Sequence, residues 1–225
     1  MIGKLFIVAT PIGNLKDFTQ RAVEVLKSVD IIAAEDTRRT RKLLNFFEIK
    51  KPMISYHDFN KEKRIPKIIK MLKEGKSVAL VSDAGTPCIS DPGYNLIVKA
   101  IEEEIEVIPI PGVSAVTAAI SVCGLPCDRF VFEGFLPRKK KKRKERLEKL
   151  KNEERTIILF ESPHRISKTL KELLEELGDR RCVFLRELTK KFEEIKRGRL
   201  SDIIKELKNG EVKGEITLVI EGKGG

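Results

Sequence analysis

Side chains that bind transition metals or form disulfides are scarce in this sequence. Among its 225 residues there are only two histidines and four cysteines, and no two cysteines have the Cys-x-x-Cys spacing. The cysteines are Cys88, Cys123, Cys127 and Cys182. Structural zinc sites and disulfide frameworks need several such ligands at close, regular spacing. The composition therefore predicts no metal centre and reduced thiols.

Long apolar runs are also missing at the start of the chain. The segment MIGKLFIVATPIGN contains one apolar run, which Pro11 interrupts. This run is about six residues long, whereas a membrane span needs roughly 20, and the core of a secretory signal is also longer. We therefore expect a cytoplasmic protein with no membrane partner.

Positive charge is abundant and concentrated in one place. The formal net charge is +11, and positions 138–144 are all basic. A solvated helix face normally carries carboxylates among its lysines, so phosphate binding is a more natural use of this run. The candidate nucleic-acid-binding residues are Arg138, Lys139, Lys140, Lys141, Lys142, Arg143 and Lys144.

Short β-branched runs alternate with longer amphipathic stretches in the first half of the chain. This pattern is typical of an α/β fold with a mostly parallel sheet and helices on both faces. The expected strands are 5–9, 31–34, 78–81 and 107–110, and the expected helices are 18–28, 37–47, 61–74 and 95–104.

Prolines at 109 and 111 interrupt this alternation, so we place a domain boundary after Pro111. The chain then consists of an N-terminal α/β domain, 1–111, and a C-terminal α/β domain, 112–225, in which the sheet is expected to be mixed. The expected strands there are 130–133, 156–161, 182–187, 192–198 and 215–221, and the expected helices are 115–122, 140–151, 166–177 and 201–208.

Three loops of small residues follow expected strands: ATPIGN from Ala9, SDAGTP from Ser82 and PIPGVSA from Pro109. Ligands of open α/β sheets gather at the carboxyl ends of strands, where backbone amides and helix N-termini converge. None of the loops has the spacing of a dinucleotide or P-loop motif, so each alone could be an ordinary turn. Together they indicate a ligand site.

Longer segments resemble a known family. VATPIGNLKDFTQRA, AAEDTRRTRKLL, VALVSDAGTPCISDPG, PIPGVSAVTAAISVCGLP, FEGFLP, FESPHR and RELTKKFEE are similar to the ribosomal RNA small subunit methyltransferase I family. This resemblance implies a two-domain tetrapyrrole-methylase-like fold that binds S-adenosylmethionine in a cleft between the domains, as a homodimer. It also implies 2'-O-methylation of a cytidine in the decoding region of 16S rRNA, on the RNA or the small ribosomal subunit.

Two segments depart from the family pattern. Family members often continue into a C-terminal helical extension, whereas this chain ends soon after Glu221. The stretch SYHDFNK, from Ser55 to Lys61, has fewer His and Glu residues than is usual in the family.

Cofactor contacts follow from the resemblance, motif by motif. Asp83 and Thr86 are expected near the amino-acid or ribose part of the cofactor, and Phe160, Glu161 and Glu215 near its adenine. The full expected set is Pro11, Gly13, Ser82, Asp83, Thr86, Ser114, Ala115, Phe160, Glu161 and Glu215.

Candidate catalytic residues lie in Glu35-Asp36-Thr37-Arg38-Arg39, at the end of an expected strand. A ribose hydroxyl is a weak nucleophile, so a carboxylate base, Glu35 or Asp36, and the cations Arg38 and Arg39 would assist its attack. Asp36 could equally be the N-cap of the next helix.

Each of the two histidines has two possible roles. His57 could be a base that titrates near neutrality or a structural histidine. His164 could line the ligand site or cap a helix.

Two other functions compete with rRNA methylation. One is a tetrapyrrole methylase of the same fold, which the basic run and the EDTRRT segment disfavour. The other is a non-catalytic RNA-binding ribosome-assembly factor, which would have no reason to keep three cofactor-type loops.

Overall fold

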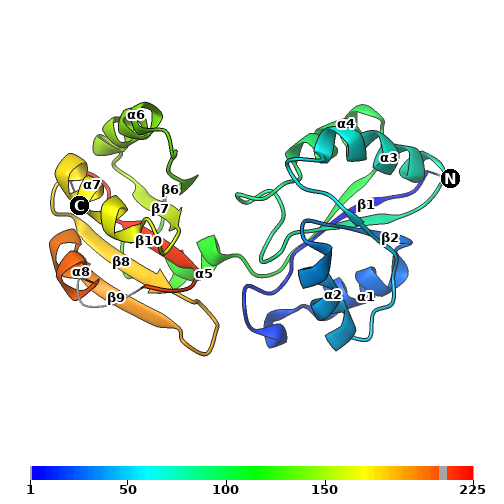
Figure 1. The fold of residues 1–225 in the computed structure, drawn as a ribbon, viewed down its shortest axis with the longest axis horizontal. Helices are drawn as coiled ribbons and strands as arrows, with labels where there is room; N and C mark the ends of the chain where they lie inside the picture. The colour runs from blue at the N-terminus through cyan, green and yellow to red at the C-terminus, as the bar shows by residue number, and fades with distance from the viewer. Residues whose placement is uncertain (1, 208–211, 225) are drawn as a thin grey trace. The chain divides into compact units, whose positions relative to one another are not determined.

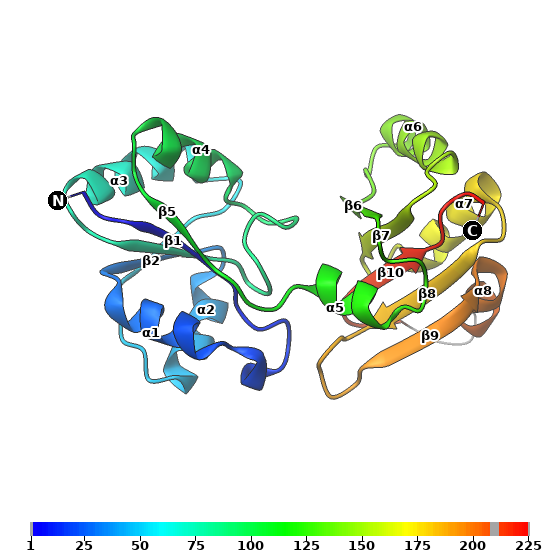
Figure 2. The ribbon, with the colours of Figure 1, turned by 180° about the vertical axis from the view of Figure 1, so that it is seen from behind.

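The computed structural model describes residues 2–207 and 212–224. The chain divides into two compact units, Met1–Ser114 and Ala115–Gly225, each built on its own five-stranded sheet. Figure 1 and Figure 2 show each sheet with its helices from opposite sides. The boundary expected from the sequence lies after Pro111, whereas the division falls directly before the helix that starts at Ala115.

The sheet of the N-terminal unit is entirely parallel, in the order β3-β2-β4-β1-β5. Its strands are β1 (Leu5–Val8), β2 (Ile31–Ala34), β3 (Met53–Ser55), β4 (Val78–Val81) and β5 (Val107–Ile110). Its helices are α1 (Gln20–Ser28), α2 (Thr37–Phe46), α3 (Lys61–Lys73) and α4 (Tyr94–Glu102), with the short 3-10 helix η1 (Leu15–Asp17). The predicted alternation is confirmed, and β3 is a strand that the sequence analysis did not predict.

Helices cover both faces of this sheet, as Figure 1 shows. Along β4, Val78 and Leu80 pack into the core beneath α3 and α4, while Ala79 and Val81 pack into the core beneath α1 and α2. A strand that is buried on both faces needs apolar side chains at every position, which explains its continuous apolar run. Polar side chains are therefore confined to the strand ends.

The sheet of the C-terminal unit is mixed, in the order β6-β7-β10-β8-β9. Only β6 and β7 are parallel, and the other pairs are antiparallel. The strands are β6 (Phe130–Phe135), β7 (Thr156–Glu161), β8 (Arg181–Arg186), β9 (Glu194–Arg199) and β10 (Ile216–Ile220). The helices are α5 (Ala115–Val122), α6 (Lys140–Lys151), α7 (Ile166–Leu177) and α8 (Leu200–Leu207). The mixed sheet is confirmed; the expected helix end at Lys208 lies outside the described residues.

Three helices pack on one face of the second sheet and one on the other. Side chains from α6, α7 and α8 share a core with Ile157, Phe184 and Leu218. On the opposite face, Val116 and Ala119 of α5 pack against alternate residues of the same strands. The basic helix α6 is attached to its unit through Leu147 and Leu150, which are buried.

Candidate functional site

The carboxyl ends of the parallel strands bring two of the small-residue loops together. Thr10, after β1, forms an isolated bridge with Gly85, after β4, with N···O distances of 2.9 and 3.0 Å. The buried hydroxyl of Thr10 also donates to the carbonyl of Ser82 at 3.2 Å. Gly85 has φ +82°, and a Cβ there would lie 3.3 Å from Ile12. A larger residue would therefore strain this junction.

The third loop, after β5, joins the same junction. The hydroxyl of Thr86 donates to the carbonyl of Val113 at 3.2 Å. A Cβ at Gly112 would lie 2.9 Å from the Cβ of Ala9, so the two loops approach as closely as a glycine allows. The three loops predicted to act together thus form one connected surface. Thr10, which joins the loops after β1 and β4, was part of a predicted loop but was not among the predicted site residues.

The cofactor candidates of this unit differ in what their side chains do. Pro11 is buried, Gly13 is exposed, and Ser114 is half-buried. Ser82 is 3% exposed, and its hydroxyl donates to the carbonyl of Gly85 at 3.2 Å, so it holds the turn. Direct cofactor contacts from these residues, and from Ala115 in the second unit, stay predictions.

Asp83 connects the loop after β4 to the loop after β2. Its Oδ1 accepts a hydrogen bond from the backbone N–H of Asp36 at 2.9 Å. Its Oδ2 lies 3.4 Å from the guanidinium of Arg39. Since 20% of the Asp83 side chain remains exposed, the carboxylate can still accept hydrogen bonds from a ligand.

Asp36 is the N-cap of α2. Its carboxylate accepts from the backbone N–H of Arg38 at 2.8 Å and forms an ion pair with the Arg38 guanidinium at 2.8 Å. Hydrogen bonds from Arg38, first from its side chain and then from its backbone, hold the pKa of Asp36 well below its usual range. A carboxylate of such low basicity is a weak proton acceptor, which favours capping over catalysis for Asp36.

Glu35 has the opposite electrostatic environment. Burial raises its pKa above the ordinary value of 4.5, and the negative charges of Asp83 and Asp58 raise it further, while Arg39 lowers it. A raised pKa makes the ionised carboxylate a stronger base. Of the two carboxylates that the sequence left as alternatives, Glu35 is the one suited to accept a proton.

His57 lies on the loop after β3, held by Asn60. The side-chain oxygen of Asn60 accepts from the backbone N–H of His57 at 2.9 Å, so its amide nitrogen must face the ring Nε2, 3.0 Å away. In the tautomer that carries the ring proton on Nδ1, Nε2 accepts this hydrogen bond. Within the described chain, Nδ1 is buried and has no hydrogen-bond partner. Because Nε2 is held by Asn60, the structure favours a structural role for His57 over a role as a base.

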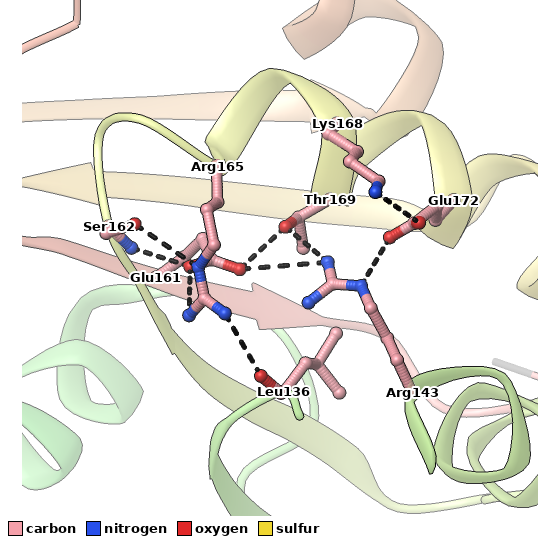
Figure 3. A network of polar contacts seen from close by, with 8 residues as sticks. All are labelled: Leu136, Arg143, Glu161, Ser162, Arg165, Lys168, Thr169 and Glu172. Carbon is pink, nitrogen blue, oxygen red and sulfur yellow. Dashed lines mark hydrogen bonds and ion pairs between the residues drawn. The ribbon is translucent and has the colours of Figure 1, made fainter. Parts of the chain in front are cut away.

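In the second unit, Glu161 lies at the centre of a buried polar network (Figure 3). Its carboxylate accepts from the backbone N–H of Ser162 at 2.7 Å and from the hydroxyl of Thr169 at 2.6 Å, and pairs with Arg165 at 2.7 Å. The side chain is 1% exposed. This chain's own donors enclose the carboxylate, so Glu161 has an internal structural role, and its expected place near the adenine stays a prediction.

Arg143 is the one residue of the basic run whose side chain is buried in the structure. Its side chain is 7% exposed and donates to Glu172 and Thr169, both at 2.6 Å (Figure 3). Helical periodicity places position 143 on the same face of α6 as Leu147 and Leu150, which is the face turned toward the core. Composition alone could not show this, because all seven residues carry the same charge.

The other six residues of the run are exposed, as phosphate binding requires. They are Arg138, Lys139, Lys140, Lys141, Lys142 and Lys144. No acidic side chain occupies the first turn of α6, and Lys139 at its N-cap makes no side-chain capping bond. Basic residues at a helix N-terminus add to the positive end of the helix dipole, so this end attracts anions.

The remaining candidates of the second unit lie at strand ends. Phe160 is half-buried and meets the rings of Phe132 and Phe135 edge to face, at 4.8 and 5.8 Å between centroids. Glu215 is exposed and pairs with Lys190 at 3.0 Å. His164 is exposed just before α7. Contacts of these residues with a cofactor stay predictions.

Two absences hold for the part of the chain that the structure describes. No group of three or more His, Cys, Asp or Glu side chains is placed to hold a metal ion. None of its helices is both long and apolar enough to cross a membrane.

Comparison with known proteins defines the class. The family model described as Tetrapyrrole (Corrin/Porphyrin) Methylases matches residues 4–204. A similar solved structure is uroporphyrin-III C-methyltransferase from Thermus thermophilus complexed with S-adenyl homocysteine, with a TM-score of 0.69 and 16% identity over 97% of each chain. The chain therefore has the tetrapyrrole-methylase fold that the sequence predicted.

Curated relatives identify the family within this class to which the chain belongs. Ribosomal RNA small subunit methyltransferase I of Thermotoga maritima is 53% identical over 222 residues, which are 99% of this chain and 100% of that protein. The protein of the same name from Halalkalibacterium halodurans is 52% identical over 99% of this chain and 77% of its own length. The chain belongs to the ribosomal RNA small subunit methyltransferase I family and is a methyltransferase.

Proposed function

We propose that this protein transfers a methyl group from S-adenosylmethionine to the ribose 2'-hydroxyl of a cytidine in the decoding region of 16S rRNA. The observation that carries this proposal is the joining of three small-residue loops beside Glu35, a carboxylate of raised pKa. The name shared by the relatives supports the choice of rRNA as substrate.

The joined loops fit S-adenosylmethionine as the methyl donor. At this edge the backbones of Gly13 and Gly112 are exposed, and the Asp83 carboxylate can accept from an ammonium or a ribose hydroxyl. The donor supplies a methyl group already activated by the sulfonium, so the protein has mainly to align the acceptor oxygen. The loops with Gly13, Gly112 and Asp83 would hold the methyl donor in place for that alignment.

Glu35 is the proton acceptor in this mechanism. S-adenosylmethionine would supply the methyl group, with its sulfur as the leaving group, and the Glu35 carboxylate would accept the hydroxyl proton of the attacking ribose. Arg38 and Arg39, whose side chains are 87% and 67% exposed, would hold the phosphates beside the target ribose. Asp36 would cap α2 and orient Arg38 rather than accept the proton.

The six exposed basic residues of the run at 138–144 would bind RNA phosphates. Contacts of this kind add affinity without sequence information, and they weaken as salt rises. Choice of the target nucleotide must therefore come from the groups around Glu35.

A labelled methyl-transfer assay tests the proposal. Radioactive S-adenosylmethionine would be supplied with assembled small ribosomal subunits, naked 16S rRNA or porphyrinoid precursors. We expect label in rRNA, at a ribose that resists alkaline cleavage of its 3' bond. Label in a porphyrinoid and none in RNA would establish the tetrapyrrole methylase instead. RNA binding without any transfer would favour the non-catalytic assembly factor.

The homodimer implied by the family resemblance is part of the proposal. Sedimentation at micromolar concentration would check it: a dimer mass is expected, and a monomer would contradict it.

A further inference from the structure

Phe59 holds an aromatic ring fully in solvent at the edge of the sheet where the candidate site lies. It is 100% exposed, more than any other large apolar side chain in residues 2–207 and 212–224. It belongs to the loop that follows β3, at the carboxyl end of the parallel strands. An isolated exposed phenylalanine is common on proteins, so its significance depends on how the loop is built and on its neighbours.

The loop that carries Phe59 is fixed by hydrogen bonds. The amide nitrogen of Asn60 donates to the carbonyl and hydroxyl of Ser55 at 3.3 and 3.1 Å. The backbone N–H groups of Asn60 and Lys61 both donate to the carbonyl of His57 at 3.0 Å. The Asn60 side chain therefore points back toward Ser55, while the Phe59 side chain lies outside and meets the ring of His57 edge to face, with 6.2 Å between centroids.

The groups next to this loop are those of the candidate site. Asp58 is near enough to Glu35 for its negative charge to raise the pKa of Glu35. Arg38 and Arg39 follow β2, the strand paired with β3, and both guanidinium groups are largely exposed. Because β2 and β3 are parallel neighbours, the loops that follow them leave the same edge of the sheet, which places an exposed ring and exposed cations at one edge. Proteins bind single-stranded nucleic acid with this combination, because bases stack on the ring while cations contact phosphates.

We propose that Phe59 is a stacking platform for a nucleobase of the single-stranded RNA segment that carries the target ribose. The ring would hold the base while Arg38 and Arg39 contact the adjoining phosphates, leaving the ribose beside Glu35. This inference rests on the proposed function and adds to it a residue that selects an unpaired nucleotide.

The chain contains no tryptophan, so Phe59→Trp would introduce a single fluorescent reporter at this position. The probe is a single-stranded oligoribonucleotide with the decoding-region sequence, and stacking of a base on the indole should quench its emission. Phe46→Trp is the matched control, since Phe46 is 64% exposed in the same unit but lies at the far end of α2. We expect quenching at position 59, none at position 46, and none at either position with S-adenosylhomocysteine alone.

Kinetics provide a second readout, because Phe59 is fully exposed and its replacement leaves the core unchanged. Phe59→Ala and Phe59→Leu should both raise the KM for RNA by roughly 5- to 100-fold, the range for one lost base stack. The KM for S-adenosylmethionine should not change, and Phe59→Tyr should restore wild-type values.

Three results would overturn the proposal. If Phe59→Trp binds and methylates RNA without quenching, Phe59 is not a platform, although the proposed function survives. Quenching by S-adenosylhomocysteine alone would assign the ring to the cofactor. If the wild-type protein neither binds nor methylates RNA, the proposed function itself fails.

Discussion

The carboxylate of Asp83 accepts a hydrogen bond from the backbone N–H of Asp36, with 2.9 Å between nitrogen and oxygen. This bond joins the loops that follow two neighbouring strands, β4 and β2. It also brings the negative charge of Asp83 close to Glu35. Burial is the largest cause of the raised pKa of Glu35, and the charge of Asp83 is the next. The Asp83 side chain thus joins the two loops and raises the pKa of the proposed proton acceptor.

Glu35→Gln should abolish most of the methyl transfer, because an amide of the same shape cannot accept the proton. General-base catalysis contributes about 100- to 10,000-fold, so the expected loss of kcat lies in that range. In the wild-type enzyme kcat should rise with pH as Glu35 ionises, with a midpoint above the ordinary 4.5. A pH–rate profile with this limb intact in Glu35→Gln would remove Glu35 from the mechanism.

Asp83→Asn should shift that limb to lower pH. The asparagine oxygen can still accept from the N–H of Asp36, so the loops stay joined, but the neighbouring negative charge is gone. Since that charge raises the pKa of Glu35, its removal lowers the pKa. Comparison of the pH–rate profiles of Asp83→Asn and the wild type would measure this shift, and identical profiles would contradict it.

Asp83→Ala removes the hydrogen bond and the carboxylate together, and we expect weaker binding of S-adenosylmethionine in a calorimetric titration. An unchanged Kd would exclude Asp83 from the cofactor site.

Asp36 should behave as a cap and not as a base. Asp36→Asn keeps a side-chain oxygen that can accept from the helix N-terminus, so both stability and kcat should stay near those of the wild type. Asp36→Ala loses the cap, and its Tm should fall by roughly a few degrees. A kcat loss as large in Asp36→Asn as in Glu35→Gln would show that the carboxylate itself takes part in the reaction.

Arg143→Met should destabilise the protein by about 3 kcal/mol or more, because it leaves the buried Glu161 and Thr169 without one of their partners. Lys142→Met is the matched control on the adjacent, exposed position, and its effect should stay within about 0.5 kcal/mol. Urea unfolding would measure both. Equal stability of the two variants would show that the network contributes nothing to folding.

Neutralising the six exposed basic residues, with Arg143 kept, should weaken RNA binding and flatten its salt dependence. Each phosphate contact that is lost should lower the slope of log K against log salt by about 0.7 for single-stranded RNA. Cofactor affinity should not change. As a control, glutamine at Lys67 and Lys70, which are exposed on α3, should leave the slope unchanged.

The sequence predicted most of the fold because most elements carry a clear period. The helix 166–177 and the strand 156–161 were predicted with the bounds that the structure has. The strand β3 was missed since Met53, Ile54 and Ser55 are too few to display alternation and follow directly on Pro52. The tertiary pairing of this segment with β2 makes it a strand.

The site was predicted less completely, because residue types do not reveal which side chains form hydrogen bonds or ion pairs with one another. Asp36 and Glu35 are adjacent carboxylates, and only the positions of Arg38 and Asp83 distinguish the capping residue from the one of raised pKa. Arg143 could not be told from Lys142 before the face of α6 was known. Arg165 lies in a segment that resembled the family, yet nothing in the sequence pointed to its pairing with Glu161.

The helix α6 depends on the rest of its unit, because its buried side chain Arg143 needs partners there. Its basic residues repel one another at i, i+4 spacing, and a helix of this length is marginal alone in water. Arg143 finds its partners only on β7 and α7, so the helix should order only after those elements have assembled. A peptide of residues 138–151 would consequently be a poor mimic of the proposed RNA-binding surface, and if these residues bind RNA, the affinity would report whether this unit has folded.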